Sequence, residues 1–459
     1  MKSKIFIALY GLFCFVAVTL MRDSWKDHLF MYDRSGYHLY LPAAVIYNDL
    51  GRLTFFSKIN YNYYPGGQYM WDWYEIFDQP TGKRLNKYPI GVSVMELPFF
   101  IAAHTYAVIA KDYPTDGYSL PYQYGGIISN LFWVLVGLAY LRGYLKRHYN
   151  DTIIFITLLG IALGTNIYFY IVYEPCMSHT YSFCLFAATI YYAEEWYRSG
   201  RSFSLFMLAI LIGLITIVRP VNILFAIVPL LWRVGNTLDM RQRLIFYYHK
   251  WKSLVIAAII FCLILFIQLS YWKYVTGKWI FYAYGKESFL WDEPRVLDGL
   301  FGFRKGWFIY SPIVFLAALG FIPLWKRDKK IVPAILVFFS GYIYVTFCWW
   351  SWWYGGGFGA RCLIETLPVM AIPLAALLQS LWSAKLKAPI FLIGVLIFLF
   401  CALNIFQCYQ ARKNIIHHDR MTFRYYWRVF CRPYVEEKDF ELLMDDKTYW
   451  KEMGRIDKK

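Results

Sequence analysis

The chain has 459 residues, of which 59% are hydrophobic, 21% are aromatic and 17% are charged, and its mean hydropathy is +0.38. Because about a quarter of the residues in a soluble domain are charged, this composition excludes an ordinary soluble protein and predicts a polytopic membrane protein. The formal net charge is +17, which Lys and Arg beside anionic membrane lipids explain without a nucleic-acid partner. The same excess would suit an anionic lipid-phosphate substrate, and charge alone does not separate these interpretations.

Long apolar runs repeated along a chain indicate transmembrane helices, since the strands of a barrel alternate in hydrophobicity. We predict an all-α polytopic membrane protein with about 11–13 transmembrane helices and a large first extracytoplasmic loop that carries juxtamembrane helices. The first run lacks a small-residue cleavage signature, so we interpret it as an uncleaved span. The apolar segments are 4–20, 89–110, 124–143, 153–173, 179–195, 203–232, 253–274, 307–324, 331–350, 363–381 and 389–408.

The segment 203–232 is too long for one straight span and is interrupted at Val218-Arg219-Pro220. Because proline breaks a helix and Arg resists the centre of a bilayer, the segment is either one kinked span or two short spans that meet at Arg219. The divided version puts the basic loops 142–151 and 196–202 on the side of the N-terminus. The divided version also requires a further crossing between 89 and 123. We favour the divided version.

Lys and Arg accumulate in cytoplasmic loops, so their distribution predicts the orientation. The basic segments are the N-terminus, 233–252, 325–330 and 382–388. The segments that alternate with them then face the outside, namely 21–88, 275–306 and 351–362. On this topology residues 1–408 form a transmembrane domain, and residues 409–459 form a short polar extracytoplasmic tail.

The first polar loop is the strongest candidate for a functional site. Asp33 could act as a general base for an acceptor hydroxyl or orient that hydroxyl, although an exposed Asp is equally often only solvated. Tyr37 and His38 follow as candidate substrate-binding residues, and His38 could instead be a metal ligand or pack at the interface. The apolar run Leu41–Tyr47 is too short to span a bilayer. We expect it to form a helix at the membrane surface that holds Asp33 near the interface.

Basic side chains at the borders of several spans are candidate phosphate ligands. Lys87 precedes Pro89 at the start of the second span, where it either anchors the span or holds a phosphate. Arg219 needs an anionic partner, which is either a buried carboxylate or a ligand phosphate. Glu174 and His179 flank a short break between two spans and are further candidates.

Two later motifs combine basic and aromatic residues. Arg304 and Lys305 precede a span. They either anchor this span or bind a phosphate at the membrane interface. The run from Trp349 to Tyr354 contains four tryptophans and leads through four glycines to Arg361. Tryptophans favour a membrane interface, glycines permit close approach of a ligand, aromatic rings suit sugars and Arg suits phosphate. No nucleotide-binding or hydrolase motif is present, and the nine cysteines form neither a Cys-x-x-Cys pair nor a Cys/His cluster.

With these motifs the chain resembles the GT-C superfamily of polytopic glycosyltransferases, which use polyprenyl-phosphate sugars and include protein O-mannosyltransferases and the aminoarabinose transferase that acts on lipid A. The similar features are Asp33 soon after the first span, the juxtamembrane helix 41–50, Lys87-Tyr88-Pro89, the break at Arg219, and the glycine-rich loop before Arg361. The chain departs from the family where Arg34 replaces a frequent second acid and where Asn86 replaces an acid that helps to bind a divalent ion. These departures argue against a divalent metal, and we assign no cofactor.

The resemblance implies a polyprenyl-phosphate sugar donor and a lipid, glycan or protein acceptor. It implies that Arg219 and Arg361, with Lys87 or Arg304, hold the donor phosphate, while Asp33 assists the acceptor hydroxyl in an inverting attack. The richness in Lys, Tyr and Phe suggests a bacterial source, so we expect a multi-pass protein of the inner membrane with its active site facing the periplasm.

Two other functions remain open. A transporter or flippase of a lipid-linked saccharide would be expected to show inverted repeats, which we do not find. An O-antigen polymerase or ligase would carry its main loop late in the chain, whereas the longest loop here, 21–88, comes first.

Overall fold

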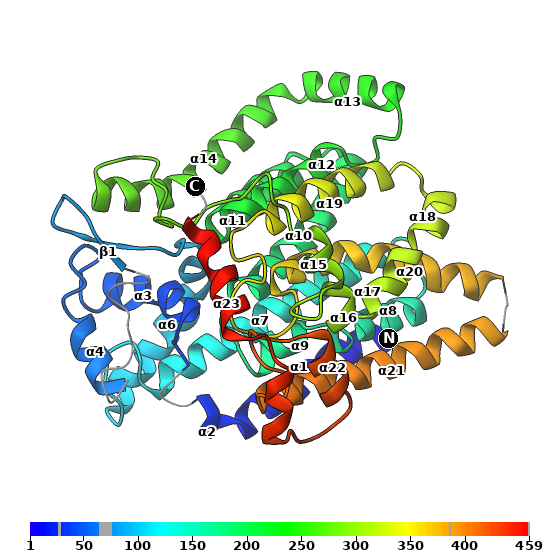
Figure 1. Ribbon diagram of the computed structural model, residues 1–459. Coiled ribbons are helices and arrows are strands. Elements are labelled where there is room, and N and C mark those ends of the chain that lie inside the picture. The colour runs from blue at the N-terminus through cyan, green and yellow to red at the C-terminus, as the bar shows by residue number, and fades with distance from the viewer. Residues whose placement is uncertain (26–28, 64–75, 385–386, 458–459) are drawn as a thin grey trace.

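The computed structural model describes residues 1–25, 29–63, 76–384 and 387–457 of the chain (Figure 1). Its regular structure is helical apart from one small hairpin, in which β1 (Ile76–Asp78) pairs antiparallel with β2 (Arg84–Asn86). The predicted helical class is therefore confirmed. Within the described ranges, six stretches are long and apolar enough to cross a membrane by length and composition. They are α1 (Lys2–Leu20), α6 (Gly91–Ala110), α7 (Leu120–Leu145), α14 (Trp251–Thr276), η2 with α20 (Arg361–Ser383) and α21 (Lys387–Arg412).

The other apolar segments are also helical, but they are shorter, broken or more polar. The predicted number of about 11–13 spans therefore exceeds the number of long apolar helices. Glycine and proline account for several breaks, such as Pro312 and Gly320 within the segment 307–324. The elements are α8 (Asp151–Leu163), α9 (Ile167–Val172), α10 (Ser178–Ser199), α11 (Ser202–Val218), η1 (Pro220–Ala226), α12 (Ile227–Leu230), α16 (Trp307–Tyr310), α17 (Ile313–Leu319), α18 (Phe321–Arg327) and α19 (Val332–Phe347).

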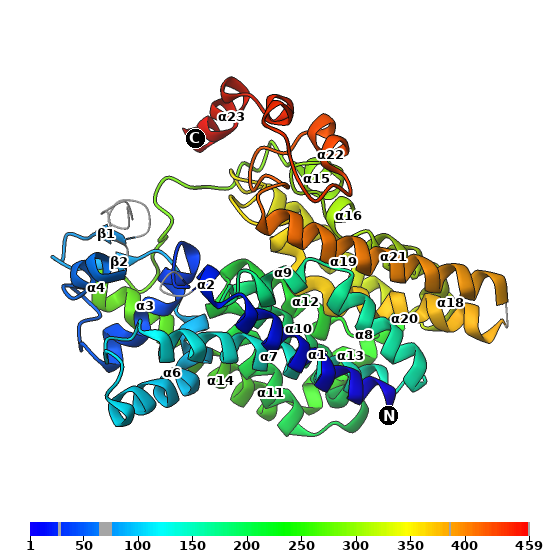
Figure 2. The same cartoon turned by 90° about the horizontal axis from the view of Figure 1, so that it is seen from below.

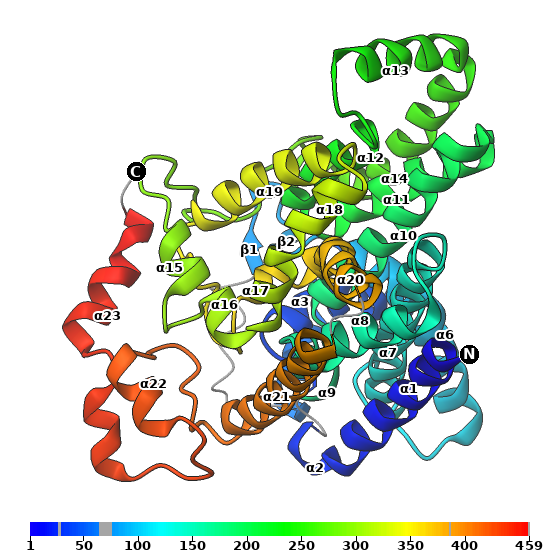
Figure 3. The same ribbon diagram turned by 90° about the vertical axis from the view of Figure 1, so that its right-hand side faces the viewer.

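The remaining helices belong to the loops and to the tail. The loop helices are α2 (Arg22–Trp25), α3 (Asp33–Val45), α4 (Phe56–Tyr63), α13 (Thr237–His249) and α15 (Val296–Phe301). The tail contains α22 (Phe423–Val429), η3 (Glu437–Leu442), α23 (Asp446–Met453) and η4 (Gly454–Asp457). In Figure 3 the tail lies beside α15 and α16, and an ion pair of 3.0 Å joins Arg304 to Asp419 there.

Ion pairs show which connections share an end of the helix bundle. The amino group of Met1 pairs with Asp151 at the start of α8 (2.7 Å), and Arg147 pairs with Glu195 near the end of α10 (2.6 Å). The connections after α7 and after α10 therefore lie at the same end as the N-terminus, as the divided version of 203–232 requires. In Figure 2 this end is on the right, and the helices of the first loop are on the left.

The further crossing predicted between 89 and 123 is wrong. This range contains α6 and the turn 111–119 before α7. The indole of Trp133, in the middle of α7, donates to the carbonyl of Met95 near the start of α6 (3.0 Å). The helix α6 therefore lies along the first part of α7, and the range, which the structure describes in full, contains no second helix that could form the extra crossing.

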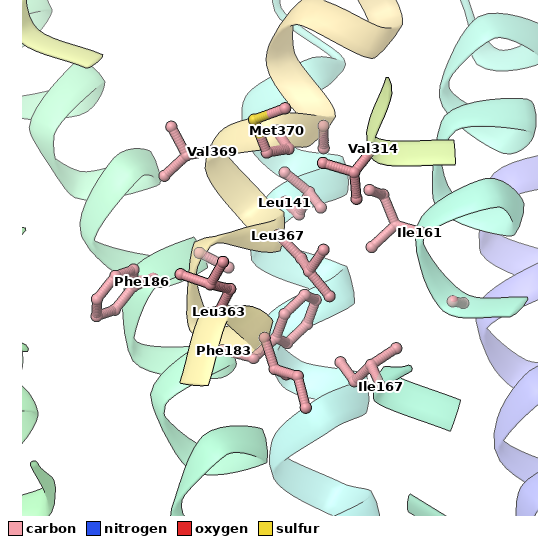
Figure 4. Close-up of a cluster of buried hydrophobic side chains, with 14 of the residues drawn as sticks. Leu141, Ile161, Ile167, Phe183, Phe186, Val314, Leu363, Leu367, Val369 and Met370 are labelled. Atoms are coloured by element: carbon pink, nitrogen blue, oxygen red, sulfur yellow. The ribbon is translucent and has the colours of Figure 1, made fainter. Parts of the chain in front are cut away.

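The centre of the bundle is α20, which is surrounded by α7, α8, α10 and α17 (Figure 4). Since lipid is as apolar as a leucine side chain, helices in a membrane associate through close packing, which small residues permit. Gly137 of α7 illustrates this, because a Cβ atom there would lie 2.8 Å from the Cα atom of Cys184 in α10. The side chains labelled in the close-up are Leu141, Ile161, Ile167, Phe183, Phe186, Val314, Leu363, Leu367, Val369 and Met370.

The helix of the first loop begins earlier than predicted and is more buried. We expected a surface helix after Asp33, but α3 begins at Asp33 and most of its residues are buried. The side-chain amide of Asn86 donates a hydrogen bond to the carbonyl of Gly36 in α3 (2.7 Å). Asp33 therefore lies in the first turn of a packed helix. The helix dipole stabilises a negative charge at this position.

Candidate functional site

A cavity of about 1410 Å³ lies among the first loop, the break after α11, the loop after α14 and the tryptophan-rich loop 349–357. The tail also contributes to its wall through residues such as His418 and Tyr449. Six of the ten predicted site residues line this cavity: Asp33, Tyr37, Lys87, Arg219, Tyr354 and Arg361.

Asp33 is held by two partners in this cavity. The hydroxyl of Tyr88 donates to one carboxylate oxygen (2.8 Å), and Arg361 pairs with the other (2.9 Å). Burial alone would raise the pKa of Asp33, but the charge of Arg361 and the bond from Tyr88 outweigh it and keep the pKa below its usual value. Gly36 makes this arrangement possible, because a Cβ atom there would overlap the ring of Tyr88.

Arg219 occupies the predicted break, and its anionic partner is a buried carboxylate. The helix α11 ends at Val218 because Pro220 cannot continue it, and Arg219 is extended. Its Nε atom lies 3.3 Å from Glu365, which also pairs with His179 (3.0 Å). The ion pair with Glu365 therefore holds the guanidinium of Arg219 in place, and Arg219 lines the cavity.

Lys87 is paired with a residue that the sequence did not single out. Its ammonium contacts the carboxylate of Glu287 in the loop after α14. The indole of Trp350 donates to the second oxygen of that carboxylate (3.1 Å). The pair joins the start of α6 to the tryptophan-rich loop across the cavity.

Aromatic rings form much of the remaining wall. Trp349, Trp350, Trp353 and Tyr284 line the cavity with Tyr354. The chain turns sharply after them, with positive φ at Tyr354, Gly355 and Gly357. Flat aromatic faces beside fixed cations suit a ligand that combines a sugar with a phosphate.

The other four predicted residues lie beside the cavity or away from it. His38 is buried against Phe30, with ring centroids 3.6 Å apart, and its Nε2 atom is 2.8 Å from the carbonyl of Gly117. This ring packs between α3 and the turn before α7, and it is not part of the cavity wall. His179 lies beneath Arg219, with Arg219 Nη1 3.2 Å from its Nε2 atom.

Arg304 and Lys305 connect the tail to the rest of the protein. Arg304 pairs with Asp419 and stacks on Trp353 at 3.6 Å. Lys305 donates to the carbonyls of Gly357 and His418. Neither side chain lines the cavity, because both are used to hold the tail against the glycine-rich turn.

Sequence reasoning gave no role to several residues that the structure brings to the site. Glu287 and the tail residues that line the wall had no distinctive sequence signal. Tyr88 stands out in the sequence only as part of the motif Lys87-Tyr88-Pro89, and Glu365 follows Arg361 by one helical turn. Among the side chains that the structure describes, no three His, Cys, Asp or Glu residues cluster as metal ligands would.

A comparison with family models finds no match for this chain, and a comparison with curated proteins finds none either. The cavity and its side chains therefore supply the basis for a functional assignment.

Proposed function

We propose that this protein is a membrane glycosyltransferase that moves a sugar from a polyprenyl-phosphate donor to an acceptor hydroxyl on a lipid, glycan or protein. The observation that carries the proposal is one cavity in which Arg219, Arg361 and Lys87 meet the carboxylate of Asp33 beside a tryptophan-rich wall. Cations suit the phosphate and aromatic rings suit the sugar, so the cavity matches both parts of the donor.

The chemistry needs fixed positive charge more than a cofactor. The acceptor oxygen forms a bond to the anomeric carbon while its O–H bond breaks and the proton passes to a carboxylate of the cavity. The bond from that carbon to the phosphate oxygen breaks, and its electron pair leaves with the lipid phosphate. Arg219 and Arg361 are already fixed by ion pairs, so they can stabilise the growing charge without reorganisation.

The lipid chain of the donor would reach the cavity from the bilayer. The apolar part of the lining includes Val218 at the end of α11, Val221 in η1, Trp272 in α14 and Phe281 in the loop after α14. Much of α14 is exposed, and helices with exposed apolar faces in such a protein face lipid. A prenyl chain beside these residues would leave its phosphate near Arg219.

The test is transfer by the purified protein in proteoliposomes, with a radiolabelled sugar on polyprenyl phosphate and membrane extract as acceptor. We expect label to appear in the acceptor with time, at equal rates for the wild type and for Glu437→Gln, an exposed position in the tail. A polyprenyl glycoside without phosphate should not serve as donor. Movement of an intact lipid-linked saccharide between leaflets, with no transfer, would replace this proposal by a flippase.

We propose further that the cavity faces the periplasm across a bacterial inner membrane, because the basic connections share the end of the N-terminus. Cys431 offers a topology test, since its thiol is exposed in the tail. A membrane-impermeant maleimide should label intact spheroplasts through Cys431, and Cys431→Ser should remove that label. Labelling that requires permeabilised membranes would reverse the orientation.

A further inference from the structure

Four acidic side chains line the cavity, and three of them have partners. Asp33 pairs with Arg361, Glu287 pairs with Lys87, and Asp419 pairs with Arg304. The fourth is Glu174. Among the residues that the structure describes, none forms a hydrogen bond or an ion pair with its carboxylate.

Glu174 lies close to the charged centre of the cavity. A Cβ atom built on Gly357 would lie 3.6 Å from a carboxylate oxygen of Glu174 and 3.8 Å from Cδ of Arg361. One small region therefore contains the unpaired carboxylate and the cation that holds Asp33. The same Cβ atom would lie 2.7 Å from the hydroxyl of Tyr170, so only glycine, with its φ of +119°, fits at Gly357.

The local fold fixes the backbone of Glu174 and leaves its side chain available. The helix α9 ends at Val172, and the amide of Glu174 donates to the carbonyl of Phe169 (3.0 Å). Pro175 then restricts the chain before α10 begins at Ser178. The turn therefore holds the backbone of Glu174 in one position, and a catalytic group that is already positioned reacts faster than a mobile one.

This part of the cavity is polar and open. Arg412, Asn414 and His418 are exposed members of its lining, and they belong to the end of α21 and to the tail. The apolar part of the lining described above lies instead in α11, η1, α14 and the loop after α14. An acceptor that arrives on the polar side would meet Glu174, while a donor that arrives on the apolar side would meet Arg219.

We propose that Glu174 is the general base that accepts the proton of the acceptor hydroxyl, an assignment that rests on the glycosyltransferase function proposed above. The acceptor O–H bond breaks and its proton moves to the Glu174 carboxylate. The oxygen bonds to the anomeric carbon, and the lipid phosphate leaves with the electron pair. Asp33 then serves as a positioning residue for Arg361, because one of its carboxylate oxygens pairs with Arg361 and the other accepts the hydrogen bond from Tyr88.

The experiment compares wild type, Glu174→Gln, Glu174→Ala and the control Glu437→Gln in the proteoliposome transfer assay. We expect Glu174→Gln to lower kcat about 10²-fold, as removal of a general base does, with donor binding unchanged when it is followed by quenching of tryptophan fluorescence. Added formate should restore part of the activity of Glu174→Ala, because a small carboxylate can occupy the vacated space.

The outcomes separate this assignment from the proposed function. If the wild type transfers no sugar, the glycosyltransferase proposal itself fails. If the wild type is active and Glu174→Gln is equally active, or if donor binding falls in parallel with kcat and formate restores nothing, Glu174 is not the base.

Discussion

Asp33→Asn is expected to lower kcat for sugar transfer about 10³-fold, the loss typical of a disrupted preorganised charge. Asparagine has the same size and can still accept the hydrogen bond from Tyr88, so the fold of α3 should persist. The substitution removes the charge that holds Arg361 at 2.9 Å. Arg361 is then free to grip the donor phosphate in the ground state, so KM should fall or stay constant while kcat falls.

The matched control is Asp78→Asn in the same loop. Asp78 is an exposed residue of β1 whose ion pair with Arg84 lies at the surface, so its loss should cost less than about 1 kcal/mol. Transfer at the wild-type rate by Asp33→Asn would remove Asp33 from the mechanism. The lowered pKa of Asp33 has a second consequence, because the stability that its charge provides is present above its unfolded pKa and is lost as the pH falls through the folded value.

Glu365→Ala should be the most destabilising substitution that we predict, with a loss of about 3–5 kcal/mol of unfolding free energy. Glu365 is fully buried and accepts a hydrogen bond from Tyr342 (2.9 Å) in addition to its contacts with His179 and Arg219. Removing the carboxylate leaves the Arg219 charge without a buried partner and creates a cavity. Thermal unfolding of the purified protein in detergent measures the loss.

A double variant separates stability from function. Glu365→Gln with Arg219→Gln removes both charges, so we expect it to recover most of the stability that Glu365→Gln alone loses. It should still fail to transfer sugar, because the phosphate ligand is gone. A stable and active double variant would show that the ion pair is structural and that Arg219 does not bind the donor.

Local rules predicted the features that depend on neighbouring residues. The break at Arg219 follows from Pro220, and the helical segments follow from long apolar runs. The pairing of Asp33 with Arg361 and of Arg219 with Glu365 joins distant parts of the chain. Such contacts depend on how the helices pack, which periodicity and residue type do not specify.

The predicted site residues that do not line the cavity show that residue type alone does not predict which side chains form a site. His38 and Arg304 have side chains suited to a site, but each is used in packing, against Phe30 and against Trp353. A sequence shows which groups can bind a ligand, and the fold decides which of them face a space. Glu174 illustrates the opposite case, since its place in a short break said little until the wall of the cavity was assembled.

The wall that the tail supplies has a consequence for biogenesis. Asp33 and Lys87 leave the ribosome early, whereas His418, Tyr449 and Met453 are synthesised last, after all the helices of the bundle. A nascent chain therefore exposes the charged centre of the cavity before it can enclose a ligand. With the orientation proposed above, translocation of the tail across the membrane becomes a maturation step, and a chain that retains the tail on the other side would fold its helices around an unfinished site.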